Sequence, residues 1–136
     1  MIAPTSDVRA ETYFRDGNQC ASCGTHALLT FQHRGAVGMG GSKIMPLVVE
    51  GLTLCLECND RTERDLQTKA LLHGWKVRRW VQQQGRSQDV PVFYAHLGIW
   101  FRLDDLERMR ITEADALAMM HAVYGRDEYE KWGLVA

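Results

Sequence analysis

The sequence has no long apolar run, no leader of basic and apolar residues at its start, and no internal repeat or low-complexity tract. A membrane-spanning helix needs roughly 18 or more apolar residues in succession, and no window approaches that length. Residues 1–7 lack the basic and apolar regions of a secretory signal. We therefore expect neither export nor membrane insertion, and a cytoplasmic location. Hydrophobic residues make up 46% of the 136 residues and charged residues 24%, which argues against disorder and for one folded domain.

The sequence also has little net charge, −1 in total, whereas proteins that bind nucleic acids normally carry an excess of Lys and Arg. The charge is unevenly distributed. Residues 61–86 contain seven bases and two acids, and residues 87–136 contain five bases and nine acids. The basic stretch predicts either a solvated surface or a nucleic-acid contact surface, and charge alone does not decide between them. If the contact exists, we expect it to use Lys69, Lys76, Arg78 and Arg79, while the acidic stretch should avoid phosphate and is a candidate surface for a protein partner.

Four cysteines form two Cys-x-x-Cys pairs, Cys20 with Cys23 and Cys55 with Cys58. In a reducing compartment such pairs bind metal rather than form disulfides. Two pairs suit tetrahedral Zn²⁺, because each tight turn presents two thiolates on one side. The alternatives are four separately buried free cysteines, which would not repeat one spacing twice, and a redox pair, which needs only one Cys-x-x-Cys. The pattern therefore predicts a structural zinc site.

Turn and capping residues divide the rest of the chain into short elements, which together indicate the α+β class. We expect helices at 8–16, ended by Gly17-Asn18, at 59–73, ended by Gly74, and from Thr112 through Tyr124, ended by Gly125. We expect a strand at 28–31, a glycine-rich loop at 37–42, an extended segment at 75–81, and a hairpin of 90–94 with 99–103.

The segment from Arg15 to Arg64 resembles the HNH endonuclease family in the order and spacing of its motifs. The matching runs are R-D-G-N-Q-C-A-S-C-G from Arg15, Q-H-R from Gln32, G-M-G-G-S from Gly38, and L-C-L-E-C-N from Leu54. The runs G-W-K-V-R-R from Gly74 and V-P-V from Val90 are similar to those of small HNH proteins of actinobacterial phages. The resemblance covers about residues 12–92 and leaves the acidic C-terminal third unexplained.

The resemblance implies a zinc-stabilised ββα-metal core at residues 12–82, to which a C-terminal hairpin and helix at 88–136 are added within one domain of residues 1–136. It also implies a bacteriophage origin, so that the cytoplasm is that of a bacterial host. In this family a divalent cation, Mg²⁺ or Mn²⁺, binds the scissile phosphate of DNA while a histidine activates water. His33 corresponds to that general base, and Arg34 is a candidate for stabilising phosphate charge.

The positions that hold the cation in the family differ here. Gln32 stands where His or Asp is usual, Asn59 stands where His is usual, although Asn also occurs there in proteins of the endonuclease VII type, and Glu50 replaces the middle Asn. Amide oxygens can bind Mg²⁺ or Mn²⁺, but hard cations prefer carboxylates, which Glu50 or Asp60 could supply. Two hypotheses follow: a metal-dependent DNA endonuclease with a weakened metal site, or a zinc-stabilised scaffold that has lost catalysis and binds DNA or a protein, with His33 chemically idle.

Overall fold

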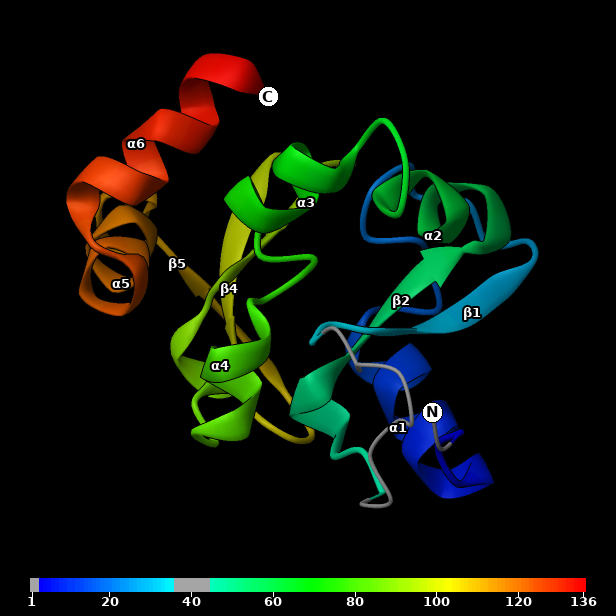
Figure 1. Ribbon diagram of the computed structural model, residues 1–136. Coiled ribbons are helices and arrows are strands. Elements are labelled where there is room, and N and C mark those ends of the chain that lie inside the picture. Colours follow the sequence, from blue (N-terminus) through cyan, green and yellow to red (C-terminus); the bar gives the residue numbers. More distant parts are fainter. Residues whose placement is uncertain (1–2, 36–44) are drawn as a thin grey trace.

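Two small antiparallel sheets, each with helices packed against it, organise this mixed α+β chain (Figure 1). The structure is a computed structural model that describes residues 3–35 and 45–136, so the glycine-rich loop expected at 37–42 lies outside the described residues. The first sheet pairs β1 (Leu29–His33) with β2 (Gly51–Cys55). The second sheet has the strand order β3 (Val92–Tyr94), β4 (Ile99–Leu103), β5 (Arg108–Ile111). The helices are α1 (Ser6–Arg15), α2 (Leu56–Thr62), α3 (Gln67–Leu72), α4 (Arg79–Gln83), α5 (Glu113–Tyr124) and α6 (Arg126–Val135), with short 3-10 turns η1 (Val48–Glu50) and η2 (Ser87–Asp89).

Helix α1 begins two residues earlier than the sequence predicts, because Thr5 is its N-cap. The hydroxyl oxygen of Thr5 accepts a hydrogen bond from the backbone N–H of Val8 at 3.2 Å, which satisfies one of the free donors of the first turn. The helix ends where Gly17 and Asn18 adopt positive φ angles of 73° and 55°. This turn brings the chain directly into the first cysteine pair.

The β1–β2 sheet presents two distinct faces to the helices around it. Gln32 lies opposite Leu52 and His33 lies opposite Gly51, so successive residues of β1 point to opposite faces. Helix α1 packs on one face, where the hydroxyl of Thr53 donates to the carbonyl of Thr12 at 3.4 Å. At the edge of β2, the carboxylate of Asp16 accepts a hydrogen bond from the backbone N–H of Thr53 at 2.8 Å. Helix α2 packs on the other face. The hairpin is therefore held between helices on both sides.

The helix expected at 59–73 is interrupted and begins earlier. Helix α2 starts at Leu56 because Cys55 is its N-cap, with its sulfur accepting from the backbone N–H of Cys58 at 3.4 Å. Helix α2 ends at Thr62, and α3 runs separately to Leu72. Gly74 follows with φ of 73°, as the sequence predicts for the residue that closes this region.

The extended segment expected at 75–81 is wrong for most of its length. Only Val77 makes a strand-like pair, with Gly35, and helix α4 begins at Arg79. Apolar and basic residues alternate at the start of this segment because Trp75 and Val77 point into the core, where they are only 1% and 2% exposed. The alternation therefore reflects burial and not a strand.

The hairpin expected at 90–94 and 99–103 is confirmed by β3 and β4, and the third helix by α5. Thr112 caps α5 by accepting from the backbone N–H of Asp115 at 3.1 Å, and Gly125 ends it with φ of 84°. The extension is larger than a hairpin and one helix, because β5 adds a third strand beside β4 and α6 packs on α3 and α5. The second sheet consequently has a helical layer on one face.

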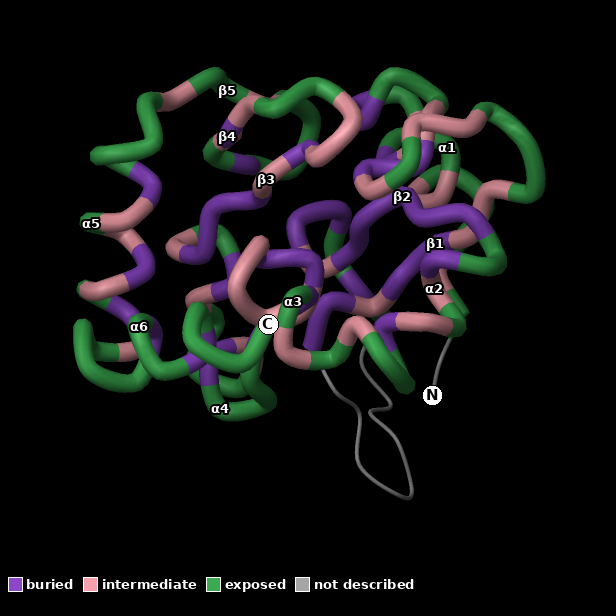
Figure 2. Tube along the Cα trace, turned by 90° about the horizontal axis from the view of Figure 1, so that it is seen from above, coloured by how far each residue is buried: buried purple, intermediate pink, exposed green. Residues whose placement is uncertain are grey.

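Two clusters of buried residues lie on either side of the second sheet. The first joins the cysteines and β2 to Trp75, Tyr94 and Leu103, and the second joins Trp100 to helices α5 and α6. Figure 2 shows buried positions concentrated in the strands and on the inner sides of the helices. Within the described residues, no helix combines the length and apolarity needed to cross a membrane.

Candidate metal centre and its surroundings

The two cysteine pairs come together as the sequence predicts. Cys20 and Cys23 lie in the turn after α1, Cys55 ends β2, and Cys58 lies in α2. Their four sulfur atoms lie within 4.8 Å of one another, and the sulfurs of Cys23 and Cys55 are 3.8 Å apart. Four sulfurs at about 2.3 Å from a tetrahedral zinc ion would be about 3.8 Å apart, whereas a disulfide requires about 2.05 Å. The cluster can therefore hold a metal ion such as zinc.

The backbone around the sulfurs is arranged to support thiolates. The N–H of Cys23 points at the sulfur of Cys20 at 3.5 Å, and the N–H of Cys58 points at the sulfur of Cys55 at 3.4 Å. Burial raises the pKa of Cys58, so this thiol keeps its proton unless a cation replaces it. Four sulfur ligands fill a tetrahedral shell and leave no position for a substrate, which is typical of a structural site. Within residues 3–35 and 45–136, no other cluster of His, Cys, Asp and Glu side chains could hold a metal in this way.

His33 lies at the end of β1, on the face of the hairpin that α1 covers. Its ring packs edge-on against Phe31, with centroids 5.1 Å apart. The side chain is half-buried, and burial together with the charge of Arg9 lowers the pKa of His33. The imidazole is therefore mainly neutral at physiological pH, which is the form that accepts a proton from water.

Gln32 and Asn59 lie on the opposite face of the hairpin from His33. The Nδ2 group of Asn59 donates to the hydroxyl of Thr30 at 2.8 Å, and Thr30 shares a face with Gln32 because they are two residues apart on one strand. Gln32 is only 2% exposed, and its Nε2 has no hydrogen-bond partner among the described residues. The structure thus brings these two positions to one side of β1.

Glu50 and Asp60 are both engaged in local contacts. The Oε1 atom of Glu50 accepts from the backbone N–H of Leu47 at 2.8 Å and so closes η1. Asp60 pairs with Arg64 at 2.6 Å on the exposed surface. Neither carboxylate contacts Gln32 or Asn59 through any hydrogen bond of the described residues.

Arg34 has a structural position, which corrects the expectation that it stabilises phosphate. Its side chain is 0% exposed, and its guanidinium donates to the backbone carbonyls of Val49, Gly74, Ser87 and Val90 at 2.8–3.1 Å. Burial lowers the pKa of Arg34 to about 10, so it still carries its charge at neutral pH. A guanidinium enclosed in this way cannot reach a bound phosphate, and instead joins β1 to the segments on either side of α4.

Arg15 and Asp16 form a second buried connection, whose role the sequence analysis missed. Arg15 holds both carboxylate oxygens of Asp16, at 2.9 and 3.0 Å, and donates to the carbonyls of Val48 and Gly51. Tyr94 of β3 also donates to Asp16, and burial followed by the charge of Asp16 raises the pKa of Tyr94. Arg15 and Asp16 belong to the R-D-G run before the first cysteine pair, but the sequence does not show which distant residues they contact.

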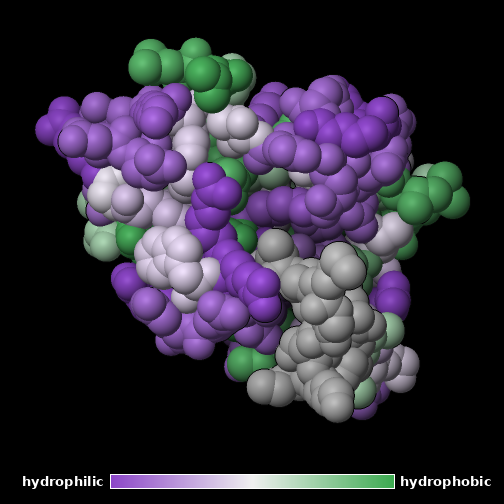
Figure 3. Space-filling view, in the orientation of Figure 1, coloured by the Kyte–Doolittle hydropathy of each residue, from purple (hydrophilic) through white to green (hydrophobic). Residues whose placement is uncertain are grey.

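The basic stretch is partly neutralised by neighbouring acids. Arg61 pairs with Asp65, Arg64 with Asp60, Lys76 with Glu63, and Arg86 with Asp89. Of the four residues expected to contact nucleic acid, Lys76 is therefore engaged, while Lys69, Arg78 and Arg79 have no ion pair within the described part of the chain. Figure 3 shows the molecule in the orientation of Figure 1, and hydrophilic residues cover much of the surface seen there, with hydrophobic residues in separate spots.

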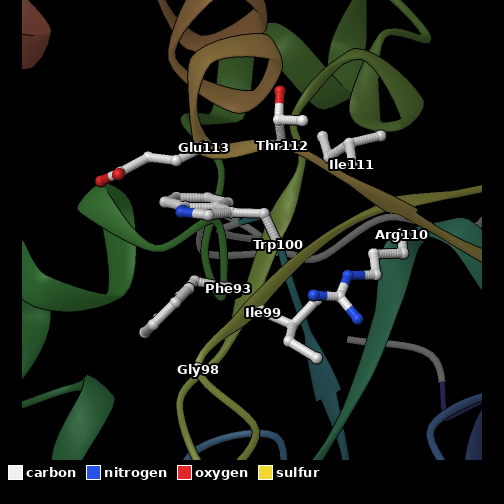
Figure 4. A pocket seen from close by; sticks show the side chains of 8 residues that line it. All are labelled: Phe93, Gly98, Ile99, Trp100, Arg110, Ile111, Thr112 and Glu113. Carbon is white, nitrogen blue, oxygen red and sulfur yellow. The ribbon is translucent and has the colours of Figure 1, made fainter.

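Two cavities among the described residues lie over the second sheet. One has a volume of about 670 Å³, and none of the predicted site residues lines it. In Figure 4, its Trp100 lies between the side chains of Arg110 and Glu113. A neighbouring cavity of about 250 Å³ includes His73, which packs against Trp75, Phe93 and Trp100. Burial, with a smaller contribution from Lys69, lowers the pKa of His73 to about 4. Neither of these two cavities is lined by the four cysteines or by His33.

Comparison of the chain with protein-family models, with curated proteins and with solved structures gave no match.

Proposed function

We propose that the chain is an HNH-type endonuclease that hydrolyses phosphodiester bonds of DNA, and that a structural zinc ion stabilises its fold. The observation that carries the proposal is the order hairpin, helix and Cys₄ cluster, with His33 at the end of the first strand and Asn59 in the helix directly after the last cysteine. This order of motifs is the one that the HNH resemblance implies, although His33 lies on the α1 face of β1 and Gln32 and Asn59 lie on the α2 face. Zinc at the cluster fixes β2 and α2 to the turn after α1, and so fixes the position of β1 between them.

His33 is the group of this chain that performs chemistry in the proposal. Its neutral imidazole accepts a proton from a water molecule as that water attacks the phosphorus atom, and the bond from phosphorus to the leaving sugar oxygen breaks. The lowered pKa of His33 favours this role, because it increases the neutral fraction at physiological pH.

The residues on the α2 face only partly fit a divalent cation. The amide oxygens of Gln32 and Asn59 are the atom type that Mg²⁺ and Mn²⁺ bind. Asn59 donates from its Nδ2 to Thr30, and its Oδ1 has no hydrogen-bond partner among the described residues. Both groups are uncharged, and the nearby carboxylates of Glu50 and Asp60 have other partners. These residues do not fit a cation that stays bound without substrate.

A second function, a DNA-binding or protein-binding module without catalysis, is favoured by this same lack of charge. Binding would then use Lys69, Arg78 and Arg79, which form no ion pair with the residues that the structure describes, or the acidic C-terminal region for a protein partner. In that case His33 would serve only to pack against Phe31.

A supercoiled-plasmid nicking assay in Mg²⁺, Mn²⁺ and Ni²⁺ tests the proposal. The wild type is compared with His33→Ala and with His26→Ala, which removes an exposed histidine near the cysteine cluster that is bonded only to the carbonyl of Asn18. Nicking that His33→Ala abolishes and His26→Ala retains supports the endonuclease. If no metal gives nicking by well-folded, zinc-loaded wild type, the binding module becomes the better account.

A further inference from the structure

Three consecutive residues at the start of α4, Arg78, Arg79 and Trp80, are all exposed to solvent. Trp80 is 40% exposed, whereas Trp75, Trp100 and Trp132 are buried. A large aromatic ring held at the surface beside two arginines has the composition of a nucleic-acid contact, since every base offers a face for stacking. This segment also follows directly on the buried Trp75 and Val77, which fix its backbone.

The exposed ring and the first arginine are held by aromatic residues of the C-terminal helices. Trp80 packs edge-to-face on Tyr124 of α5, with ring centroids 5.9 Å apart and an interplanar angle of 84°. The guanidinium of Arg78 lies 5.5 Å from the ring centroid of Trp132, and the backbone N–H of Arg78 donates to the hydroxyl of Tyr124 at 3.3 Å. An edge-to-face contact uses only part of the indole surface, which fits the exposure that remains. The two side chains are consequently ordered before any ligand binds.

The charges of this segment are available for phosphate. Within residues 3–35 and 45–136, neither Arg78 nor Arg79 forms an ion pair, in contrast to Arg61, Arg64, Lys76 and Arg86. An arginine that already pairs with a carboxylate gains less from a phosphate, because it must first give up that partner. The two arginines beside Trp80 can therefore contact a strand without first giving up a carboxylate.

The segment is attached to the end of β1, two residues beyond His33. The backbone N–H of Val77 donates to the carbonyl of Arg34 at 2.8 Å, and Val77 forms a parallel bridge with Gly35. The side chain of Gln82 covers Gly35 so closely that a Cβ atom there would lie 1.9 Å from its Oε1. These links limit the Cα separation of His33 and Arg79 to about 20 Å, a distance that a strand of several nucleotides spans.

We propose that Arg78, Arg79 and Trp80 bind an unpaired nucleic-acid strand, with Trp80 stacking on a base and the two arginines contacting phosphates. The proposal rests on the proposed function and specifies its substrate class, a single strand or a structure that contains one. A regular duplex hides the base faces inside its stack, so it could contact the arginines but would leave Trp80 unused. Preference for unpaired nucleotides is therefore the property that distinguishes this arrangement from a plain basic patch.

Fluorescence anisotropy with a labelled single strand of about 12 nucleotides, in DNA and RNA forms, and with the matching duplex tests the proposal. The zinc-loaded full chain is used without added Mg²⁺ or Mn²⁺, so that binding is measured without cleavage. We expect Trp80→Ala to weaken single-strand binding at least about fivefold and duplex binding far less, and Trp80→Phe to restore part of the loss. Arg78→Gln and Arg79→Gln should each lower the slope of log K against log salt by about 0.7.

Two control variants change an exposed apolar residue and an arginine elsewhere on the surface. Leu97→Ala removes an exposed apolar side chain, and Arg64→Gln removes an arginine that is already paired. We expect both to bind like the wild type. Equal or tighter binding of the duplex, or unchanged single-strand binding in folded Trp80→Ala, overturns the proposal. Its failure is separable from that of the proposed function, because His33→Ala should abolish nicking without changing these affinities, whereas Trp80→Ala should change them without touching the proton-accepting group.

Discussion

The hydroxyl of Tyr94 donates a hydrogen bond to the carboxylate of Asp16, 78 positions earlier in the chain. Both side chains are fully buried, and Asp16 is also held by Arg15 and by the backbone of Thr53. The contact joins the second sheet to the turn before the cysteine cluster. The C-terminal region is thus bonded to the proposed catalytic region by a charged group that has no access to water.

Removing either partner of this contact should destabilise the whole chain. We expect Tyr94→Phe to lower the free energy of unfolding by about 1.5–3 kcal/mol, since a buried charged acceptor loses one donor. Asp16→Asn should cost about 3–5 kcal/mol, because Arg15 is left as a buried charge without its partner. Urea unfolding of both single variants and the double variant measures the coupling. The surface pair Arg126–Glu130 is the control, and additive effects of Tyr94→Phe and Asp16→Asn would contradict the assignment.

Arg34 should behave as a stabilising residue and not as a catalytic one. Arg34→Lys keeps the charge but loses the planar array of donors that serves four carbonyls, so we expect a loss of about 3–5 kcal/mol in unfolding free energy. Thermal unfolding and circular dichroism check this expectation. An Arg34→Lys protein with wild-type stability and greatly reduced nicking would instead place Arg34 at the phosphate.

The stability of the fold should decline in acid partly because of His73. Its folded-state pKa of about 4 lies below the ordinary value of 6.5, so the unfolded chain binds a proton that the folded chain refuses between those values. The stability that neutral His73 contributes is complete above about pH 6.5 and is lost as the pH falls toward 4. Because the ring is partly exposed, we expect a loss of at most about 2 kcal/mol.

The variant His73→Phe isolates this effect from loss of metal, which acid also promotes. The wild type and the variant are unfolded at matched zinc content across pH 4–7, and the difference between their free energies is compared. That difference should move in favour of His73→Phe as the pH falls. A difference independent of pH would show that His73 titrates normally.

A carboxylate at position 59 should strengthen binding of a divalent cation. Asn59→Asp adds charge on the face that also carries Gln32, and we expect Mn²⁺ to bind about tenfold more tightly, by about 1.4 kcal/mol. Calorimetry with the folded, zinc-loaded protein measures this, with Gln67→Glu as an exposed amide-to-carboxylate control. Equal gains in both variants would mean that Mn²⁺ binds to general surface charge and not to this face.

Local signals predicted the elements whose causes are local. Paired cysteines at one spacing predicted the cluster, and Thr112 with Gly125 predicted both ends of α5, because each signal acts within a few residues. The start of α2 was missed because a cysteine side chain, Cys55, caps it in place of the usual Asn or Asp. The pairing of the first hairpin and its following helix was implied only by the HNH resemblance, because the residues themselves predicted a strand at 28–31 and no partner for it.

Contacts between distant segments could not be predicted. The burial of Arg34 depends on four carbonyls that lie 15–56 residues away in the chain. The Q-H-R run that contains Arg34 gives no indication of these partners. Strand β5 reads R-M-R-I, an alternation of only four residues, and becomes a strand by pairing with β4. The segment 75–81 alternates like a strand because Trp75 and Val77 are buried by tertiary packing, yet helix α4 begins within it at Arg79.

The most direct test of the account is the metal at the cysteine cluster, measured by elemental analysis together with X-ray absorption on the purified chain. The account predicts one zinc per chain with four sulfur neighbours at about 2.3 Å, reduced zinc content and folding in Cys55→Ser, and no such change in the exposed neighbour variant Glu57→Gln. A protein that contains no zinc, or that keeps its fold in a strong chelator, would contradict the zinc-centred hairpin and helix on which the proposed function rests.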